Sequence, residues 1–154
     1  FRADDAHELE SQLLALHAGN LAGSGPLFLK YAGQAGVPGA DLVMEAYLEG
    51  HLRTLAPQPG GRLDPDADDA GVVNRLRAAA DIWLAARPGA ADQAQGRVWH
   101  GRVAEYARDH ALAVAKFREA LELDPGSYDA RLYLALALGP DAPAESVHHL
   151  EQLR

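Results

Sequence analysis

Three aspartates in a polar segment of the chain have the spacing of metal ligands. Asp64, Asp66 and Asp68 stand at alternate positions, as the first ligands of a calcium-binding loop do. Such a loop also needs a glycine at its sixth position, where the chain bends, and a bidentate glutamate at its twelfth. Counted from Asp64, these two positions hold Asp69 and Arg75. We therefore expect a solvated loop here, with no metal site.

The seven histidines of the chain are the other candidate metal ligands. His148 and His149 are adjacent, and neighbours on a helix point about 100° apart, so this pair cannot readily chelate one ion. His100 and His110 fall on different expected helices, and no H-E-x-x-H motif occurs. A metal-binding, cofactor-binding or enzymatic site assembled in space from dispersed His, Asp and Glu side chains is the alternative that stays open.

Residues suited to covalent catalysis are scarce. The chain has no cysteine, four serines and one threonine, and no serine stands in a G-x-S-x-G turn. No G-x-x-x-x-G-K-[ST] run is present to hold a phosphate. We accordingly expect no catalytic residues and no cofactor, and we interpret the chain as a non-enzyme.

The composition predicts an all-α protein and limits its partners. The 154 residues include 31 Ala and 23 Leu but only 8 Val, 1 Ile and 1 Thr, and β-branched residues are the ones that strands favour. The net charge of −8 and the scattered basic residues argue against a nucleic-acid partner. No apolar run reaches the roughly 18 residues of a membrane span. The compartment stays unknown, and the start at Phe1 leaves a processed exported protein and a longer parent chain both open.

Glycine and proline divide the chain into eight expected helices. Pro26 suits the first turn of the second helix, where a missing N–H costs nothing, and Asp41 is the expected N-cap of the third. Between the third and fourth helices lies a stretch rich in Pro, Gly and Asp, at 57–71, which is too interrupted to be helical. The expected helices are 5–18, 24–32, 42–55, 72–86, 91–107, 110–123, 127–138 and 144–154.

The clearest repeat-like pattern lies between residues 95 and 138. Ala113-x3-Phe117-x2-Ala120 is followed by Pro125, and Gly101 precedes it. This arrangement resembles a tetratricopeptide repeat, with small residues where two helices of a hairpin approach closely. Three positions depart from the family pattern, which prefers Trp, Leu and Tyr where this chain has Arg97, His100 and Ala104. The chain is therefore similar to degenerate bacterial members of the family.

A period of about 34 residues extends the resemblance. One period beyond Gly101 lies Ala135, and Gly50 with Pro88 resembles an earlier glycine and exit proline. The distance from Gly50 to Pro88 is 38 residues, against 24 from Gly101 to Pro125. The excess of 14 matches the segment 57–70, which we interpret as an insertion. The resemblance thus implies one domain, 1–154, of antiparallel hairpins stacked in a right-handed superhelix, with repeats at 5–37, 40–89, 94–127 and 128–154.

In this family the first helices of successive hairpins line a concave face that binds peptides or partner helices. The resemblance therefore implies a scaffold or adaptor, or a subunit of a larger complex, that binds a protein segment. Packing against neighbouring helices is the other interpretation of the same residues. Transferred by register, the concave face holds Met44, Tyr47, His51, Gln95, Val98, Arg102, Asp129 and Leu132.

A run of leucines near the C-terminal end also suggests a partner. Leu132, Leu134, Leu136 and Leu138 cover more than one face of the expected helix 127–138, and a helix apolar all round is usually buried. The next expected helix is too polar to cover all of them. We expect either that the array continues or that this end docks on another subunit.

Overall fold

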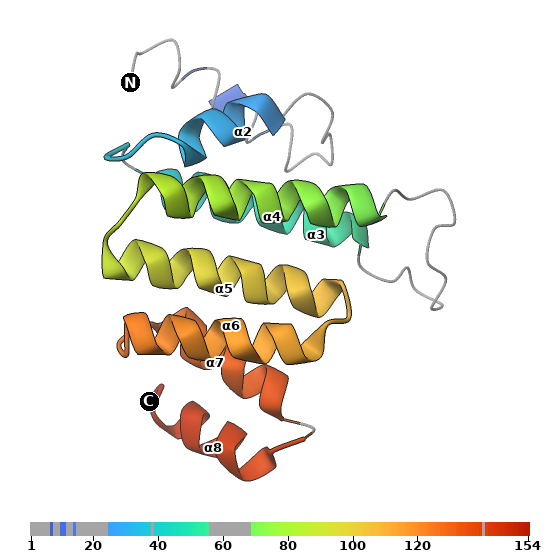
Figure 1. Cartoon of the computed structure of the whole chain (residues 1–154), viewed down its shortest axis with the longest axis vertical. Helices are drawn as coiled ribbons and strands as arrows, with labels where there is room; N and C mark the ends of the chain where they lie inside the picture. Colours follow the sequence, from blue (N-terminus) through green and yellow to red (C-terminus); the bar gives the residue numbers. More distant parts are fainter. Residues whose placement is uncertain are drawn as a thin grey trace. The chain divides into compact units, whose positions relative to one another are not determined.

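The computed structural model describes residues 25–37, 39–55, 69–139 and 141–154, together with residues 7, 10, 11 and 14. Within these residues the chain is all-helical and has no strand, which confirms the predicted class. The helices, labelled in Figure 1, are α2 (Gly25–Ala32), α3 (Ala40–Leu55), α4 (Asp69–Ala86), α5 (Ala90–Tyr106), α6 (His110–Leu123), α7 (Tyr128–Leu138) and α8 (Pro143–Glu151). The chain forms two compact units, residues 1–82 and 83–154.

Two sequence predictions fall mainly outside the described residues. They are the helix expected at 5–18 and the insertion expected at 57–70. The final two residues of that insertion are described, and they begin α4 at Asp69, so the fourth helix starts three residues earlier than expected. Asp41 is not an N-cap, because α3 begins at Ala40 and places Asp41 in its first turn. A carboxylate there still interacts favourably with the helix dipole.

The first unit is built around aromatic contacts between α2 and α3. Phe28 stacks on Tyr47 with ring centroids 4.9 Å apart, and both rings are fully buried. The edge of the His51 ring meets Tyr47, with centroids 4.5 Å apart. Pro26 lies in the first turn of α2 as predicted. Offset and edge-on ring pairs of this kind add about 0.5–1.5 kcal/mol to the burial of their surfaces.

Side-chain caps fix the N-terminal ends of α6 and α7 in the second unit. Asp109 Oδ1 accepts a hydrogen bond from the backbone N–H of Leu112 at the start of α6. Ser127 Oγ accepts one from Ala130 at the start of α7. Each cap satisfies an N–H that has no partner within the helix, which typically contributes about 1 kcal/mol.

Helices α5 to α8 of the second unit pack in chain order. α5 contacts α6 and α7, α6 contacts α7, and α7 contacts α8; Figure 1 shows α5 and α6 side by side. The shared core contains mostly alanine with a few large side chains, so the helices can approach closely. Its buried members are Ala94, Val98, Ala104, Ala113, Phe117, Ala120, Ala130, Leu134, Ala137 and Leu138.

Two glycines allow α5 to pack on both of its sides. A Cβ added to Gly101 would come within 2.7 Å of Cδ1 of the buried Phe117 on α6. A Cβ added to Gly96 would come within 2.7 Å of Cγ of Leu84, at the end of α4. The predicted close contact at Gly101 is confirmed, whereas the contact at Gly96 was not anticipated.

Candidate functional site

The three predicted partner-binding residues of α3 lie in the interior. Met44 and Tyr47 are fully buried, and His51 is only 7% exposed. Burial lowers the pKa of His51 below its usual value, and the charge of Arg75 lowers it further. Burial also raises the pKa of the Tyr47 hydroxyl. None of these three side chains is open to a partner in this structure, and the packing interpretation of them fits better.

Of the five predicted partner-binding residues in the second unit, two are buried and three are partly exposed. Val98 is fully buried, and Arg102 is also buried, with its guanidinium carbon 4.7 Å from the centroid of the Tyr133 ring. Gln95, Asp129 and Leu132 are partly exposed. Of the predicted residues in the second unit, Gln95 on α5 and Asp129 and Leu132 on α7 are thus accessible to solvent.

A row of apolar side chains remains accessible on α7. Tyr128 is 58% exposed, Leu136 is 61% exposed, and Leu132 between them is partly exposed. Residues four apart lie on the same face of a helix, so these three form one stripe, which we call the α7 stripe. Leu134 and Leu138, which the sequence grouped with Leu132 and Leu136, are buried. Only part of the leucine run is therefore accessible.

His110 contacts two carboxylates, and of the polar contacts described this one most resembles a catalytic arrangement. Its Nδ1 lies 2.9 Å from Oε1 of Glu105, and its Nε2 lies 3.4 Å from Oδ2 of Asp141. The His110 and Glu105 side chains are about two-fifths exposed, and that of Asp141 is 74% exposed. Contacts as accessible to water as these hold helix ends together weakly. We interpret them as a surface link between the α5–α6 turn and the α7–α8 turn.

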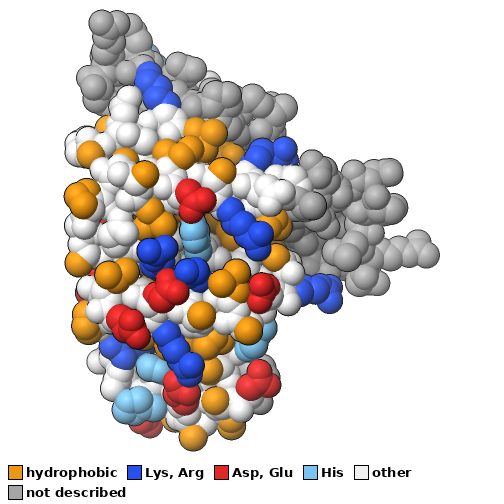
Figure 2. Space-filling model, in the orientation of Figure 1, with side chains coloured by type: hydrophobic (Ala, Val, Ile, Leu, Met, Phe, Trp, Pro, Cys, Tyr) orange, Lys and Arg blue, Asp and Glu red, His pale blue; other side chains and the backbone are white. Residues whose placement is uncertain are grey.

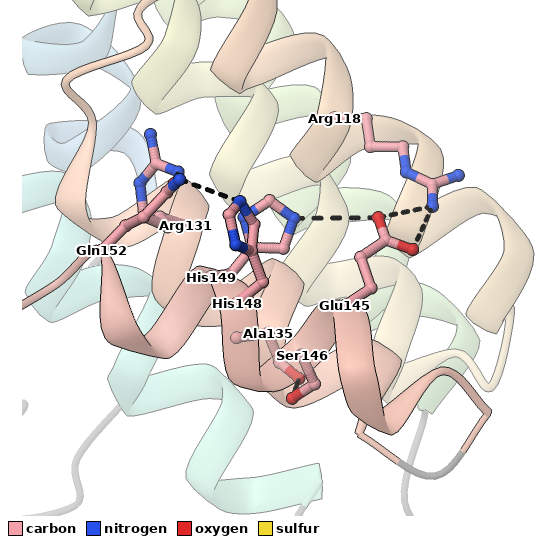
Figure 3. Close-up of polar contacts among 8 residues, drawn as sticks. All are labelled: Arg118, Arg131, Ala135, Glu145, Ser146, His148, His149 and Gln152. Carbon is pink, nitrogen blue, oxygen red and sulfur yellow. Dashed lines mark hydrogen bonds and ion pairs between the residues drawn. The ribbon is translucent and has the colours of Figure 1, made fainter.

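A second group of polar contacts fastens α8 to its neighbours, as Figure 3 shows. Oγ of the buried Ser146 donates a 2.6 Å hydrogen bond to the backbone oxygen of Ala135 on α7. Nη2 of Arg118 on α6 donates to Oε1 of Glu145 at 3.0 Å. Arg131 of α7 bonds to the side-chain oxygen of Gln152, just beyond α8. These contacts position the last helix and are not arranged around a ligand.

Within the part of the chain that the structure describes, no three His, Asp or Glu side chains come together in a way that could hold a metal ion. None of the helices in that part has the length and hydropathy needed to cross a bilayer. On the face drawn in Figure 2, the coloured acidic and basic side chains are interspersed, and neither sign forms a broad area.

Comparison of the chain with protein-family models, with curated proteins and with solved structures gives no match.

Proposed function

We propose that the chain is a non-enzymatic scaffold of the tetratricopeptide type, which binds a segment of a partner protein along the α7 stripe. The observation that carries this proposal is the stripe itself, formed by Tyr128, Leu132 and Leu136. Single exposed apolar residues are ordinary on protein surfaces. Three on one helical face form a larger apolar surface than a single residue does, which is typical of an interaction site.

The packing of the second unit supports the repeat interpretation. α5 contacts its hairpin partner α6 and also α7, the first helix of the following hairpin. Gly101 lies at the closest approach of α5 to α6, where the family pattern requires a small residue. If the same packing recurs along the chain, the hairpins form a right-handed superhelix, and α7 belongs to its concave face.

The α7 stripe suits a partner segment with apolar side chains at helical or extended spacing. Tyr128 offers a broad ring with a polar hydroxyl, a combination that is common at protein interfaces. Asp129, beside the stripe, adds a carboxylate that would pair with a basic residue of the partner. A preformed helical surface loses little conformational entropy on binding, so the partner bears most of the ordering cost.

The absence of cysteine in the chain permits a direct test by site-specific cross-linking. Leu136→Cys and Tyr128→Cys would each be labelled with a thiol-reactive photo-cross-linker and irradiated in an extract of the source organism. Asp141→Cys is the matched control, because the Asp141 side chain is 74% exposed but lies outside the stripe. We expect the same protein to be cross-linked from positions 128 and 136 and not from 141.

Competition distinguishes specific binding from general stickiness of an apolar label. An excess of the unlabelled native chain should suppress cross-linking, while an excess of Leu136→Glu should not, because a carboxylate in the stripe opposes apolar contact. Equal labelling from position 141, or equal competition by both chains, would refute the proposal.

A further inference from the structure

The terminal helix α8 contains a histidine whose environment favours its neutral form. The His149 side chain is 15% exposed. Its Nδ1 is buried and has no hydrogen-bond partner among the described residues. The other ring nitrogen, Nε2, lies 3.7 Å from Oε1 of Glu145, one turn earlier on the same helix. In the neutral ring that carries its proton on Nε2, Nδ1 is an acceptor without a donor. The protonated ring would place a charged N–H there with no acceptor among the described residues, which costs more.

Most of the charges around His149 oppose the protonation of its neutral ring. Among the helices that the structure describes, α7 makes extensive contacts with α8. The charge of Arg131 on α7 acts against a positive charge on the ring. The ring of the preceding residue, His148, lies 5.9 Å from the His149 ring between centroids. Its charge also opposes protonation of His149. The carboxylate of Glu145 favours protonation, and Arg118 of α6 already binds its oxygens. Burial, together with Arg131, lowers the pKa of His149 despite Glu145.

We propose that α8 is a pH-dependent cap, which is docked on α7 while the His149 ring is neutral and is released when that ring takes up a proton. Release gives the protonated ring access to water and separates it from Arg131. It also breaks the Ser146–Ala135 hydrogen bond and uncovers the part of α7 around Ala135. The device requires no ligand, and it does not depend on the proposed function of the α7 stripe.

The direction of the pH dependence follows from the lowered pKa. The docked state binds protons less readily than the released state, so docking is strongest above the ordinary histidine pKa of about 6.5. As the pH falls below that value towards the lowered pKa of docked His149, the docked state loses stability. Each unit by which docking lowers this pKa weakens docking in acid about tenfold.

Hydrogen exchange of the intact chain tests the proposal. Exchange of the α8 amides would be followed by mass spectrometry at pH 7.5 and pH 5.5 and corrected for the intrinsic effect of pH on exchange. In the native chain we expect protection of α8 to fall in acid, while α5 and α6 keep theirs. His149→Gln, whose side chain stays neutral, should remove most of this loss.

His110→Gln is the matched control, because it makes the same chemical change at a histidine of α6 whose ring contacts Glu105 and Asp141. It should leave the acid-induced loss intact. If protection of α8 is independent of pH in the native chain, or if His149→Gln loses it as steeply as the native chain, the proposal is wrong.

If His149→Gln leaves the α8 amides unprotected at both pH values, an NMR titration tests the proposal instead. The His149 ring signals would be titrated by NMR in the native chain and in Arg131→Gln. We expect a pKa below the ordinary value in the native chain and an increase in Arg131→Gln, because the opposing cation is gone. A native pKa at or above about 6.5 would overturn the proposal.

Discussion

Gly101 of α5 lies directly against the ring of Phe117 on α6, so closely that a Cβ at position 101 would be 2.8 Å from Cζ of that ring. Phe117 is fully buried and cannot turn aside without disturbing the core of the second unit. The contact sets the spacing of the α5–α6 hairpin, and a small residue at position 101 is a steric requirement.

Gly101→Ala should therefore destabilise the protein by about 1–3 kcal/mol, the usual cost of overpacking a core, although alanine is the better helix former. Chemical denaturation would measure the change in the free energy of unfolding. In a double-mutant cycle, Phe117→Leu should cost less in the Gly101→Ala background than in the native chain, because the two side chains interact. Simple additivity of the two costs would contradict the steric explanation.

Gln93 of α5 holds the C-terminal end of α4. Its Nε2 donates to the backbone oxygens of Leu84 at 2.8 Å and Arg87 at 2.6 Å. Gln93→Ala should cost about 1–2 kcal/mol for the lost bonds. Gln93→Glu should cost more, because a carboxylate cannot donate and would face the negative end of the helix dipole. Thermal unfolding would compare both with Gln95→Glu, the same chemical change at a partly exposed neighbour, which we expect to be near neutral.

Arg108 ends α5 in a conformation that suits glycine. Its φ is 61°, and Asp109 N–H bonds back to the oxygen of Ala104 at 2.9 Å, as in a Schellman cap. A left-handed conformation costs a non-glycine residue about 1–2 kcal/mol. Arg108→Gly should thus stabilise the protein by about 1 kcal/mol, whereas Arg108→Ala should not. Equal unfolding midpoints for the two variants would argue against strain at this position.

His51 makes the stability of the first unit depend on pH. Its pKa is lowered by burial and then by Arg75, so the folded state binds protons less readily than the unfolded state. Stability is therefore greatest above about pH 6.5 and falls as the pH drops through and below that value. Unfolding measured at pH 7.5 and 5.5 should show a smaller acid-induced loss in His51→Phe, which keeps a ring against Tyr47 and cannot be protonated. An unchanged loss in that variant would assign the pH dependence to other groups.

The sequence predicted helix positions well because Gly and Pro mark most of the turns. The turn Asp124–Pro125–Gly126 separates α6 from α7 as expected. The turn at Arg108 has no glycine, so nothing in the residues indicated its left-handed conformation. The beginning of α4 at Asp69 was missed because a run of aspartates is as typical of a loop as of a first helical turn.

The candidate site was harder to predict, because a helix covered on several sides has no simple polar face. Arg102 and Gly96 of α5 are buried alongside Val98, so residue type alone did not separate core from surface. The family register placed Tyr47 and His51 on a binding surface, yet Tyr47 stacks on Phe28 and His51 packs against Tyr47. Leu136 belonged to the leucine run that suggested a partner, whereas Tyr128 was overlooked because it lies at the very start of its helix.

Affinity for the cross-linked partner is the measurement that tests the central claim most directly. Dissociation constants would be compared for the native chain, Leu136→Glu and the control Asp141→Lys, after circular dichroism has shown equal helix content. The α7 stripe account predicts that Leu136→Glu weakens binding about tenfold or more, as expected for an apolar contact at the centre of an interface, and that Asp141→Lys changes it little. Equal affinity of the native chain and Leu136→Glu would contradict the account.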